Sequence, residues 1–367
     1  MSPLVASAPG RVNLIGEHTD YNGGLCLPVA LPQRTTVSVV ARTDRALSLS
    51  SAQEDGVWEG AVEDRPDGWA AYVAGVVFVL RDNGYDVPGF DAVIESEVPV
   101  GAGLSSSAAL ECSVATALAG LLELDLTDRA ERRRLAAACI RAENEYVGAP
   151  TGGMDQTVAM LGRPGQALLL DFGDDTGPRV TPVALPLADA GLVLLVVDTR
   201  VSHTLTDGSY GDRRTESARA AEALGAASLR EVSLADVDRI DDPVLRRRAR
   251  HVVTENQRVR DVVSALDADE WQRVAELLDE SHTSMRDDFE ISCRELDLAV
   301  ETARAAGALG ARMTGGGFGG SAIALVPAAS VDDVRRGVTA AFVDAGLREP
   351  RHLVATPGVA ARVDSVS

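Results

Sequence analysis

Four ionisable side chains surround one short apolar run near the start of the chain. Arg11 stands before this run at residues 12–15, and Glu17, His18 and Asp20 stand after it. Carboxylate and imidazole groups at the end of a strand suit the vicinal hydroxyls of a sugar, because each hydroxyl both donates and accepts a hydrogen bond. Glu, His and Asp are also metal ligands, although no second His or Cys stands at ligand spacing. A salt-bridged turn without a ligand is the third interpretation.

A glycine- and serine-rich segment between a predicted strand and a predicted helix is the second candidate. Its members are Gly101, Ala102, Gly103, Leu104, Ser105, Ser106 and Ser107. Glycine lets a backbone approach a ligand closely, and the start of a helix presents unpaired N–H groups to an anion. Two glycines and three serines exceed what a helix cap requires. We therefore interpret the segment as a phosphate-binding loop whose hydroxyls could also serve Mg²⁺; a serine-capped turn is the alternative.

Two further segments could carry chemistry. Asp155 follows Gly152, Gly153 and Met154 and precedes an apolar stretch. It could simply cap a helix, but beside a phosphate loop and an arginine it becomes a candidate general base. Residues 315–320 contain five glycines and match the dinucleotide fingerprint literally, yet a strand is predicted after them where that fingerprint needs a helix. We expect a hairpin whose backbone closes on a ligand; a merely permissive loop is the alternative.

The composition excludes several classes of protein. The 367 residues carry 35 basic and 55 acidic side chains, a net charge of −20, and every basic residue is arginine. Without lysine, the chain lacks the common P-loop, the strand lysine of protein kinases and any Schiff-base lysine. The acidic balance argues against nucleic-acid binding. We interpret the arginine runs 132–134 and 246–248 as solvated helix faces.

Cysteine spacing and hydropathy indicate the compartment. The four cysteines form no CxxC pair and are expected to be buried thiols in a reducing environment. No apolar run reaches the ~20 residues of a membrane span, and no secretory leader is visible. We therefore expect a cytoplasmic protein that binds neither membranes nor nucleic acid.

Hydrophobic periodicity predicts an α+β chain. Strands are expected at residues 12–15, 36–42, 46–50, 92–98, 166–172, 191–199, 311–314, 321–326 and 352–356. Helices are expected at residues 68–83, 105–123, 127–147, 213–224, 244–266, 270–285, 295–306 and 331–345. The proline-rich stretch 173–187 is the predicted linker.

Together these segments resemble the signature motifs of the GHMP small-molecule kinases. Residues 10–24 match the sugar signature of the galactokinase family, residues 101–108 resemble the ATP loop, and residues 313–320 resemble the third motif. The first motif is highly specific, and the other two identify the superfamily. The sequence departs from the pattern at Gly153 and at residues 149–152, which lack a cysteine often seen there.

The resemblance implies a two-domain α+β fold with the active site between the domains. Residues 1–185 would carry a mixed sheet, and residues 186–367 antiparallel strands with helices. It further implies transfer of the γ-phosphoryl group of ATP to the anomeric hydroxyl of α-D-galactose by a monomer. Asp155 would be the catalytic base, and Arg11 would stabilise the charge of the transition state. The sugar would contact Glu17, His18, Thr19, Asp20, Gly152, Asp155 and Tyr210. The loop 101–107 would wrap the phosphates, while Ser107 and Glu143 would hold Mg²⁺.

Arg11 beside Asp155 would keep this carboxylate ionised, so the proton is expected to move late in phosphoryl transfer. Two alternatives stay open. A non-catalytic sugar and nucleotide sensor is disfavoured because Ser107, Asp155 and Arg11 are all present. A kinase for N-acetylgalactosamine or arabinose would differ in the width of the pocket around the second carbon of the sugar.

Overall fold

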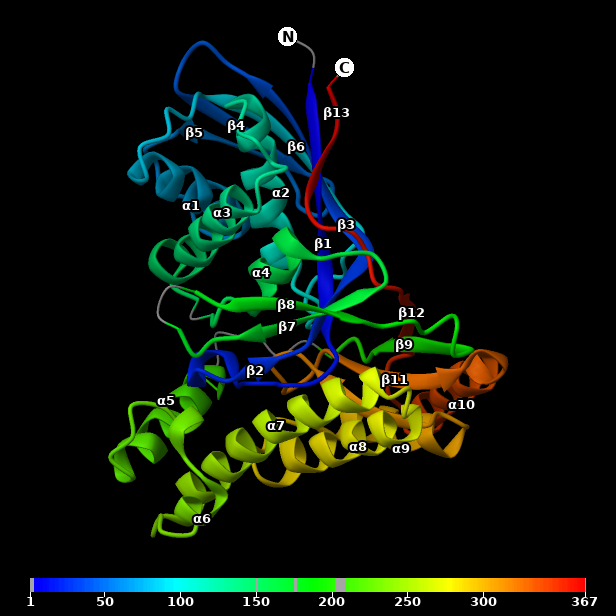
Figure 1. Ribbon diagram of the computed structural model, residues 1–367. Coiled ribbons are helices and arrows are strands. Elements are labelled where there is room, and N and C mark those ends of the chain that lie inside the picture. The colour runs from blue at the N-terminus through cyan, green and yellow to red at the C-terminus, as the bar shows by residue number, and fades with distance from the viewer. Residues whose placement is uncertain (1–2, 150, 175–176, 202–208, 367) are drawn as a thin grey trace.

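The structure is a computed structural model that describes residues 3–149, 151–174, 177–201 and 209–366. The chain forms two lobes, each with a sheet and a layer of helices, and its two ends lie side by side at the top of Figure 1. Within the described ranges, no helix combines the length and apolar character that crossing a bilayer requires.

The N-terminal lobe contains a six-stranded mixed sheet of order β13-β1-β3-β6-β4-β5. Its strands are β1 (Leu4–Asn13), β3 (Pro28–Ala41), β4 (Ala46–Ser51), β5 (Val57–Ala61), β6 (Phe90–Ser96) and β13 (Arg362–Val366). Strands β4 and β6 pair in parallel, and the other neighbours pair antiparallel. The mixed sheet expected for the first half is therefore confirmed. One of its two edge strands, β13, comes from the end of the chain.

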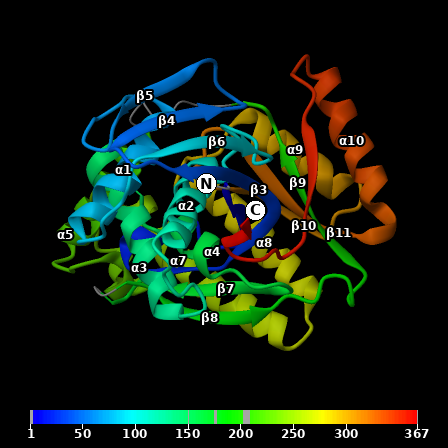
Figure 2. The same cartoon turned by 90° about the horizontal axis from the view of Figure 1, so that it is seen from above.

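Four helices cover one side of this sheet (Figure 2). They are α1 (Trp69–Asp82), α2 (Ser106–Leu121), α3 (Arg129–Arg141) and α4 (Met154–Leu161). Helix α2 packs across β1 and β3, and its buried positions are mostly small residues. At Gly120 an added Cβ would stand 2.7 Å from Cδ1 of Leu4. Small side chains therefore let α2 lie close to the sheet and bring its N-terminal end beside β1.

The C-terminal lobe contains a four-stranded antiparallel sheet of order β10-β11-β9-β12. Its strands are β9 (Leu192–Asp198), β10 (Gly310–Thr314), β11 (Ser321–Pro327) and β12 (Arg351–Ala355). The helices of this lobe are α5 (Ser209–Ala223), α6 (Leu234–Val237), α7 (Pro243–Asp267), α8 (Trp271–Asp287), α9 (Arg294–Ala305) and α10 (Val331–Asp344). The predicted antiparallel half is thus confirmed.

A central apolar core joins the two lobes. It combines Leu14 and Ile15, which follow β1, with Val259 of α7, Leu277 of α8 and Ile323 of β11. Because residues from both halves are buried in one cluster, the segments that carry the sequence motifs are held against each other.

Three sequence predictions need correction. The proposed linker contains strand β8 (Arg179–Ala184), which pairs with β7 (Gln166–Asp171) in a small sheet with β2 (Leu25–Cys26). Pro182 is tolerated there because β8 is an edge strand. Strands β1 and β3 begin at Leu4 and Pro28 rather than at residues 12 and 36, and β1 has a register shift between Pro9 and Arg11.

The third correction concerns the arginine runs, which are not simply solvated faces. Arg132 donates to the carbonyl oxygens of Leu126, Met160 and Ala361 at 2.6, 3.1 and 2.7 Å. Arg248 is buried and donates to the carboxylate of Glu216 and to other groups of the C-terminal lobe. Both guanidinium groups therefore hold elements together.

Candidate active site

Arg11 and Asp155 form an ion pair at the junction of the two lobes. Nε and Nη2 of Arg11 lie 2.8 and 3.0 Å from Oδ1 and Oδ2 of Asp155. Burial disfavours the charge of Arg11, but the carboxylates of Asp155, Glu17 and Asp20 outweigh burial and raise its pKa. The guanidinium is more buried than its partner, with side-chain exposures of 7% and 21%. Asp155 thus faces the open side of the pair.

Ser105 is a further partner of Asp155. Its hydroxyl donates to Oδ2, so the predicted phosphate loop reaches the predicted base directly. Oδ2 then accepts two hydrogen bonds, from Ser105 and Arg11, whereas Oδ1 accepts one. A carboxylate offers about four lone-pair positions, two on each oxygen. Oδ1 is therefore the atom with room for a substrate hydroxyl.

The phosphate loop is shaped by the third glycine-rich motif, which packs against it. A Cβ on Gly315 would stand 2.8 Å from the carbonyl oxygen of Gly103, and one on Gly320 would stand 3.1 Å from that of Ala102. Ser321 donates to the same Ala102 oxygen at 2.7 Å. The two motifs approach each other this closely because glycine has no side chain. Residues 315–320 thus join the antiparallel strands β10 and β11, as expected for a hairpin, and the expected closure of their backbone on a ligand stays a prediction.

The start of α2 has unpaired backbone donors that could receive an anion. Its N-cap, Ser105, has φ 61° and ψ 51° and makes no side-chain cap, because its hydroxyl is bonded to Asp155. The first N–H groups of a helix have no intrahelical acceptor and lie at the positive end of its dipole. The capped-turn alternative therefore fails for Ser105, and the helix N-terminus stays available for a phosphate.

Glu143 and Ser107, the two predicted magnesium ligands, lie near each other beside this helix start. Glu143 belongs to a π-helical turn, η2 (Ala142–Val147), and Ser107, in the first turn of α2, lies near enough for its hydroxyl to act toward lowering the pKa of Glu143. Burial, followed by the charge of Asp155, raises the pKa of Glu143 to about 7. Nε2 of Gln156 lies 2.5 Å from Oε2 of Glu143 and 3.0 Å from Oε2 of Glu111, a second buried carboxyl group.

The side chains of Ser107 and Glu143 fit a magnesium ion. Hydroxyl and carboxylate oxygens are the hard ligands that Mg²⁺ prefers, and it usually takes one or two from protein, with phosphate oxygens and waters completing the shell. In the described part of the chain, no cluster of three or more His, Cys, Asp or Glu could hold a metal by itself. A site of two protein ligands that depends on bound nucleotide agrees with both observations.

Glu17 occupies the turn after β1 and is almost completely buried. Its Oε1 accepts from the backbone N–H of Gly315 at 2.8 Å, and its Oε2 accepts from Asn13 at 2.5 Å. Burial raises the pKa of Glu17, while the charges of Arg312 and Arg11 act in the opposite direction. Glu17 thus ties the sugar signature to the third motif.

His18 stands at the centre of an aromatic group. Its ring lies 4.9 Å from that of Tyr210 and 5.0 Å from that of Phe289, measured between centroids. Burial lowers the pKa of His18 to about 3, so the ring is neutral. Nε2 lies 3.0 Å from the carbonyl oxygen of Gly316 and must donate to it, which leaves Nδ1 to accept from the hydroxyl of Tyr21 at 2.6 Å.

Asp20 and Gly152 are in direct contact. A Cβ on Gly152 would stand 2.0 Å from Oδ2 of Asp20, so this position has room for glycine alone. Burial raises the pKa of Asp20 to about 6, and the charges of Asp155 and Glu17 act in the same direction. Gly153 has φ 97° and an Ile140 side chain against its Cα, so glycine is also suited to this position before α4.

Thr19 has its side chain turned into the protein. It is completely buried, and its hydroxyl lies 3.0 and 2.7 Å from the carbonyl oxygens of Gly16 and Leu25. The hydroxyl of Thr19 therefore stabilises the loop between β1 and β2, residues 14–24, which we call the sugar loop. The segment before Tyr210, residues 202–208, lies outside the described residues.

Helix α7 supports the sugar loop with side chains that were not predicted. Nε2 of His251 lies 3.1 Å from the carbonyl oxygen of Glu17, and Oε1 of Glu255 accepts from the N–H of Gly16 at 3.0 Å. Oδ1 of Asn256 accepts from the N–H of Leu25 at 2.8 Å. The i, i+4 spacing places His251 and Glu255 on one helix face, and Asn256 borders this face. A polar stripe on an otherwise apolar face was the available signal.

Models of three protein families match the chain. Residues 1–41 match the galactokinase galactose-binding signature, residues 71–163 the N-terminal domain of GHMP kinases, and residues 262–344 their C-terminal domain. The sugar loop, the helix that begins at Ser106, and Asp155 all fall within these ranges, and so does the third glycine-rich motif.

Curated relatives cover nearly the whole chain. A galactokinase of Streptomyces coelicolor is 50% identical over 98% of this chain and 93% of its own length. One from Mycobacterium tuberculosis is 49% identical over 96% and 98%. The crystal structure of Lactococcus lactis galactokinase complexed with galactose is 35% identical, with a TM-score of 0.91 over 98% of this chain and 95% of its own. A mevalonate kinase of Methanococcus jannaschii, 16% identical with a TM-score of 0.69 over 99% of both chains, shares the fold. Because it matches these three family models and is similar to galactokinases over nearly its full length, the chain belongs to the galactokinase family of the GHMP kinases and is an ATP-dependent sugar kinase.

Proposed function

We propose that the chain transfers the γ-phosphoryl group of ATP to the anomeric hydroxyl of α-D-galactose, with Asp155 as the base. The observation that carries this proposal is the Arg11–Asp155 pair, which lies where the phosphate loop meets the sugar loop. Nη1 of Arg11 donates at 2.5 Å to the carbonyl oxygen of Gly103 in the phosphate loop. One guanidinium thus connects the base with the loop that would hold the nucleotide.

Asp155 acts as a weak base. Three hydrogen bonds, two from Arg11 and one from Ser105, hold its carboxylate in place. The sugar hydroxyl is far less acidic than the conjugate acid of such a carboxylate, so early proton removal is unfavourable. The hydroxyl donates to Oδ1, and its proton moves to Asp155 as the bond to phosphorus forms. Positioning and charge stabilisation then supply most of the rate.

Arg11 has two tasks in this mechanism. It orients the carboxylate of Asp155 through both oxygens, which fixes the direction in which Oδ1 faces. It also places a buried positive charge beside the transferred group, where negative charge spreads over the equatorial oxygens. Since the chain has no lysine, arginine, loop amides and the N-terminus of α2 must together meet the phosphate charge.

Ser107 and Glu143 would hold Mg²⁺ against the nucleotide. Bound there, the ion would neutralise phosphate charge. Gln156 hydrogen-bonds Glu143 and follows Asp155 in sequence, so the carboxylate of the metal site and the base are fixed by neighbouring residues of α4.

The sugar would lie between Asp20, His18, Tyr210 and the backbone at Gly152. Neutral His18 and the aromatic rings offer an apolar wall, and Asp20 offers a hydrogen-bond acceptor to hydroxyls. Glu17 and Thr19 would act chiefly by holding the loop, because their polar atoms are bonded to neighbouring protein groups.

The test combines one variant with a panel of acceptors. Asp155→Asn should retain nucleotide binding and lose sugar phosphorylation by at least about 10²-fold, the lower range for removal of a general base. The matched control is Asp189→Asn, which changes an exposed aspartate. ADP release should be fastest with galactose among galactose, N-acetylgalactosamine, arabinose, glucose and mevalonate. Near-normal turnover of the variant would remove Asp155 from the mechanism, and a preference for another sugar would reassign the acceptor.

The domain boundary after residue 185, the monomeric state and the cytoplasmic location expected from the sequence stay predictions.

A further inference from the structure

A second pocket lies at the far end of the helix that carries Asp155. Its volume is about 370 Å³, and it is lined by the end of α4 at Leu161 and Gly162, the start of α3 and the segment before β13. Asp155 is in the first turn of α4, so the pocket and the candidate base are at opposite ends of one eight-residue helix. None of the predicted site residues lines it.

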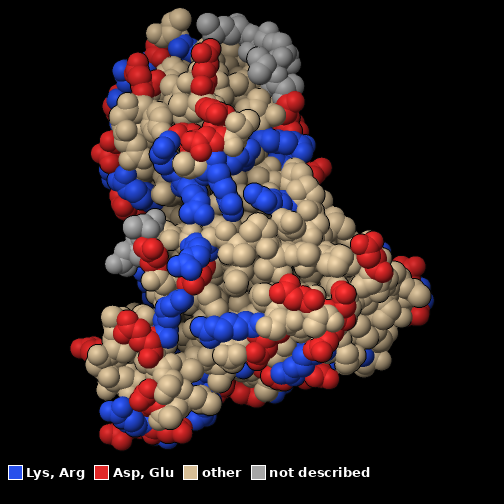
Figure 3. All heavy atoms as spheres, in the orientation of Figure 1, with Lys and Arg blue, Asp and Glu red and all other residues tan. Residues whose placement is uncertain are grey.

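Positive charge is concentrated in this pocket. Arg129, Arg132, Arg163 and Arg362 line it, and among the residues that the structure describes no aspartate or glutamate does. On the face of the molecule that Figure 3 shows, which is also the face seen in Figure 1, basic side chains gather across the middle. In a chain with 55 acidic and 35 basic residues, such an arrangement is unexpected, because like charges placed together repel one another.

Two of these guanidinium groups have donors to spare. The side chain of Arg163 is exposed and makes no hydrogen bond or ion pair with any described residue. That of Arg129 makes one long contact, 3.5 Å from Nη2 to the carbonyl oxygen of Val180. Burial and the charges of Arg163 and Arg133 lower the pKa of Arg129. Arg132 uses backbone carbonyls as acceptors, so its charge is also unopposed, whereas Arg362 is paired with Asp364.

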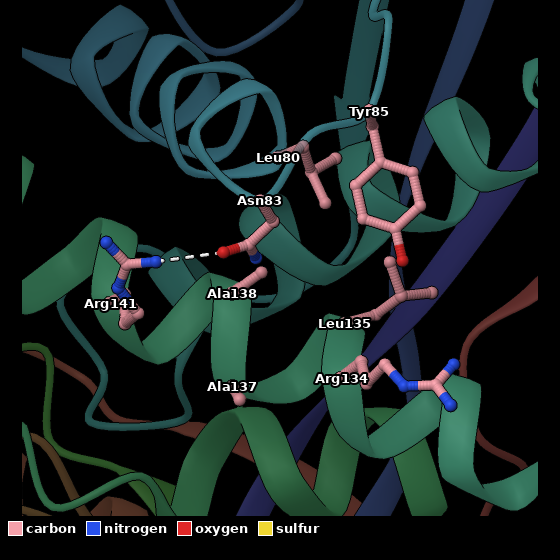
Figure 4. Close-up of a pocket in the computed structure, with 8 residues that line it drawn as sticks. All are labelled: Leu80, Asn83, Tyr85, Arg134, Leu135, Ala137, Ala138 and Arg141. Atoms are coloured by element: carbon pink, nitrogen blue, oxygen red, sulfur yellow. Dashed lines mark hydrogen bonds between the residues drawn. The ribbon is translucent and has the colours of Figure 1, made fainter.

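The pocket between α1 and α3 provides a contrast. It has a similar volume, about 400 Å³, and is also lined by two arginines, Arg134 and Arg141 (Figure 4). There each arginine is neutralised: Arg134 pairs with Glu131, and Arg141 with Asp82 and Glu145. Neither pocket is lined by a described carboxylate. The two pockets differ in pairing: nearby carboxylates neutralise Arg134 and Arg141, whereas Arg129, Arg132 and Arg163 have no described carboxylate partner.

We propose that the pocket of Arg129, Arg132, Arg163 and Arg362 is a second binding site, and that its ligand is a small phosphate-bearing molecule. Arginine forks bind phosphate oxygens in pairs, and a phosphate dianion would supply the negative charge that the lining lacks. A volume of about 370 Å³ suits a compact ligand such as a sugar phosphate or free phosphate. An acidic polypeptide would need a longer groove.

The test measures binding when the catalytic site is already filled. The protein is saturated with galactose and a non-hydrolysable ATP analogue, and then titrated calorimetrically with galactose 1-phosphate or with inorganic phosphate. The double variant Arg129→Gln, Arg163→Gln should weaken binding at least about 10-fold, because it removes two charge-assisted contacts. The control, Arg133→Gln, removes an equal kind of charge from the same helix but outside the pocket, and should change affinity less than about 2-fold.

The outcomes separate the possible ligands. Tighter binding of the sugar phosphate assigns a phosphate ester, and equal binding assigns free phosphate; both support the site. No binding of either probe to the wild type would overturn it, as would an equal loss in the Arg133 variant, which would indicate diffuse surface charge. Phosphate should also raise the melting temperature of the wild type and not that of the double variant, provided that both melt alike without ligand. If the ATP analogue itself does not bind, the proposed function fails, while the comparison of variants still reports on the pocket.

Discussion

The hydroxyl of Ser105 donates to Oδ2 of Asp155, although the two residues are 50 positions apart in the sequence. This bond joins the phosphate loop to the candidate base and leaves Oδ1 with the free acceptor position. A serine that could have capped α2 is used instead to orient the carboxylate.

Ser105→Ala should lower kcat about 10-fold, because a hydrogen bond to a charged group contributes about 1.5–3 kcal/mol. The KM values for galactose and ATP should change less than about 3-fold, since the bond orients the base and not the substrates. Steady-state kinetics with Ser113→Ala as the control check this, because the Ser113 hydroxyl bonds only within α2. If the Ser105 hydroxyl only lowered the basicity of Asp155, the kcat of Ser105→Ala would equal or exceed that of the wild type.

The metal site can be tested by the magnesium dependence of the rate. Glu143→Gln and Ser107→Ala should each raise the Mg²⁺ concentration for half-maximal rate about 10-fold or more, as expected when a metal ligand or its close partner is lost. The control is Glu145→Gln, two residues further on, whose exposed carboxylate pairs with Arg141. If the rates of both site variants depend on the Mg²⁺ concentration as the wild-type rate does, other residues hold the ion.

The contact between Gly152 and Asp20 predicts a specific loss of sugar binding. Gly152→Ala places a methyl group where Oδ2 of Asp20 now lies, so either Asp20 or the glycine loop must move. The KM for galactose should rise about 10-fold, the effect of roughly 1–3 kcal/mol of overpacking, and the KM for ATP should change little. Gly211→Ala is the control, because its added Cβ meets no atom within 4 Å. Equal changes in both KM values would instead indicate a general collapse of the site.

Much of the fold could be predicted because most elements carry strong periodic patterns. The helix expected at residues 244–266 is α7 (Pro243–Asp267), and the strand expected at 321–326 is β11 (Ser321–Pro327). The linker prediction failed because prolines were taken as breaks, whereas Pro182 lies on an edge strand that does not need every N–H. Whether a strand is an edge strand depends on its neighbours, which local sequence does not contain.

The site could be predicted where its residues are contiguous in sequence and could not where it depends on packing. Arg11, Glu17 and His18 fall in one motif, so their proximity followed from the sequence. The support from His251, Glu255 and Asn256 comes from a helix more than 200 residues away. Arg132 was likewise taken as solvated because two of the carbonyl oxygens that it binds, those of Met160 and Ala361, belong to segments 28 and 229 residues away.

Asp20 should link stability to pH. Its pKa is raised from 3.8 to about 6, chiefly by burial, so the folded state holds this proton more tightly than the unfolded state. Stability is therefore lost as pH rises from about 4 to 6, and the full cost is present above pH 6. Asp20→Asn should stabilise the protein by about 1–2 kcal/mol at pH 8 and by less than half of that near pH 4.5.

The same variant should bind galactose more weakly, since a charged acceptor is lost. Its amide oxygen can still accept from the N–H of Tyr21, which Oδ1 of Asp20 now does at 2.9 Å. Denaturant unfolding at the two pH values gives the difference, with Asp189→Asn as the exposed control. A stabilisation independent of pH would show that the ionisation of Asp20 is not its cause.

Glu255 should be essential for stability and not for chemistry. This carboxylate is completely buried, accepts from Gly16, Ser281 and Arg258 at 3.0, 2.7 and 2.7 Å, and stands 3.9 Å from buried Arg312. Burial alone would raise its pKa, but the charges of Arg258 and Arg312 outweigh burial and hold it well below its usual range.

Glu255→Gln leaves two buried cations without this counter-charge and should cost about 3–5 kcal/mol of unfolding free energy. The matched Glu276→Gln, in an exposed pair with Arg273, should cost less than about 1 kcal/mol. Because the depressed pKa of Glu255 stabilises the fold fully above its unfolded value of 4.5, the gap in unfolding free energy between wild type and Glu255→Gln should stay constant from pH 7 to about 5 and narrow as the pH falls below 4.5. Equal unfolding free energies for the two variants at pH 7 would show that α7 does not hold the sugar loop through this charge.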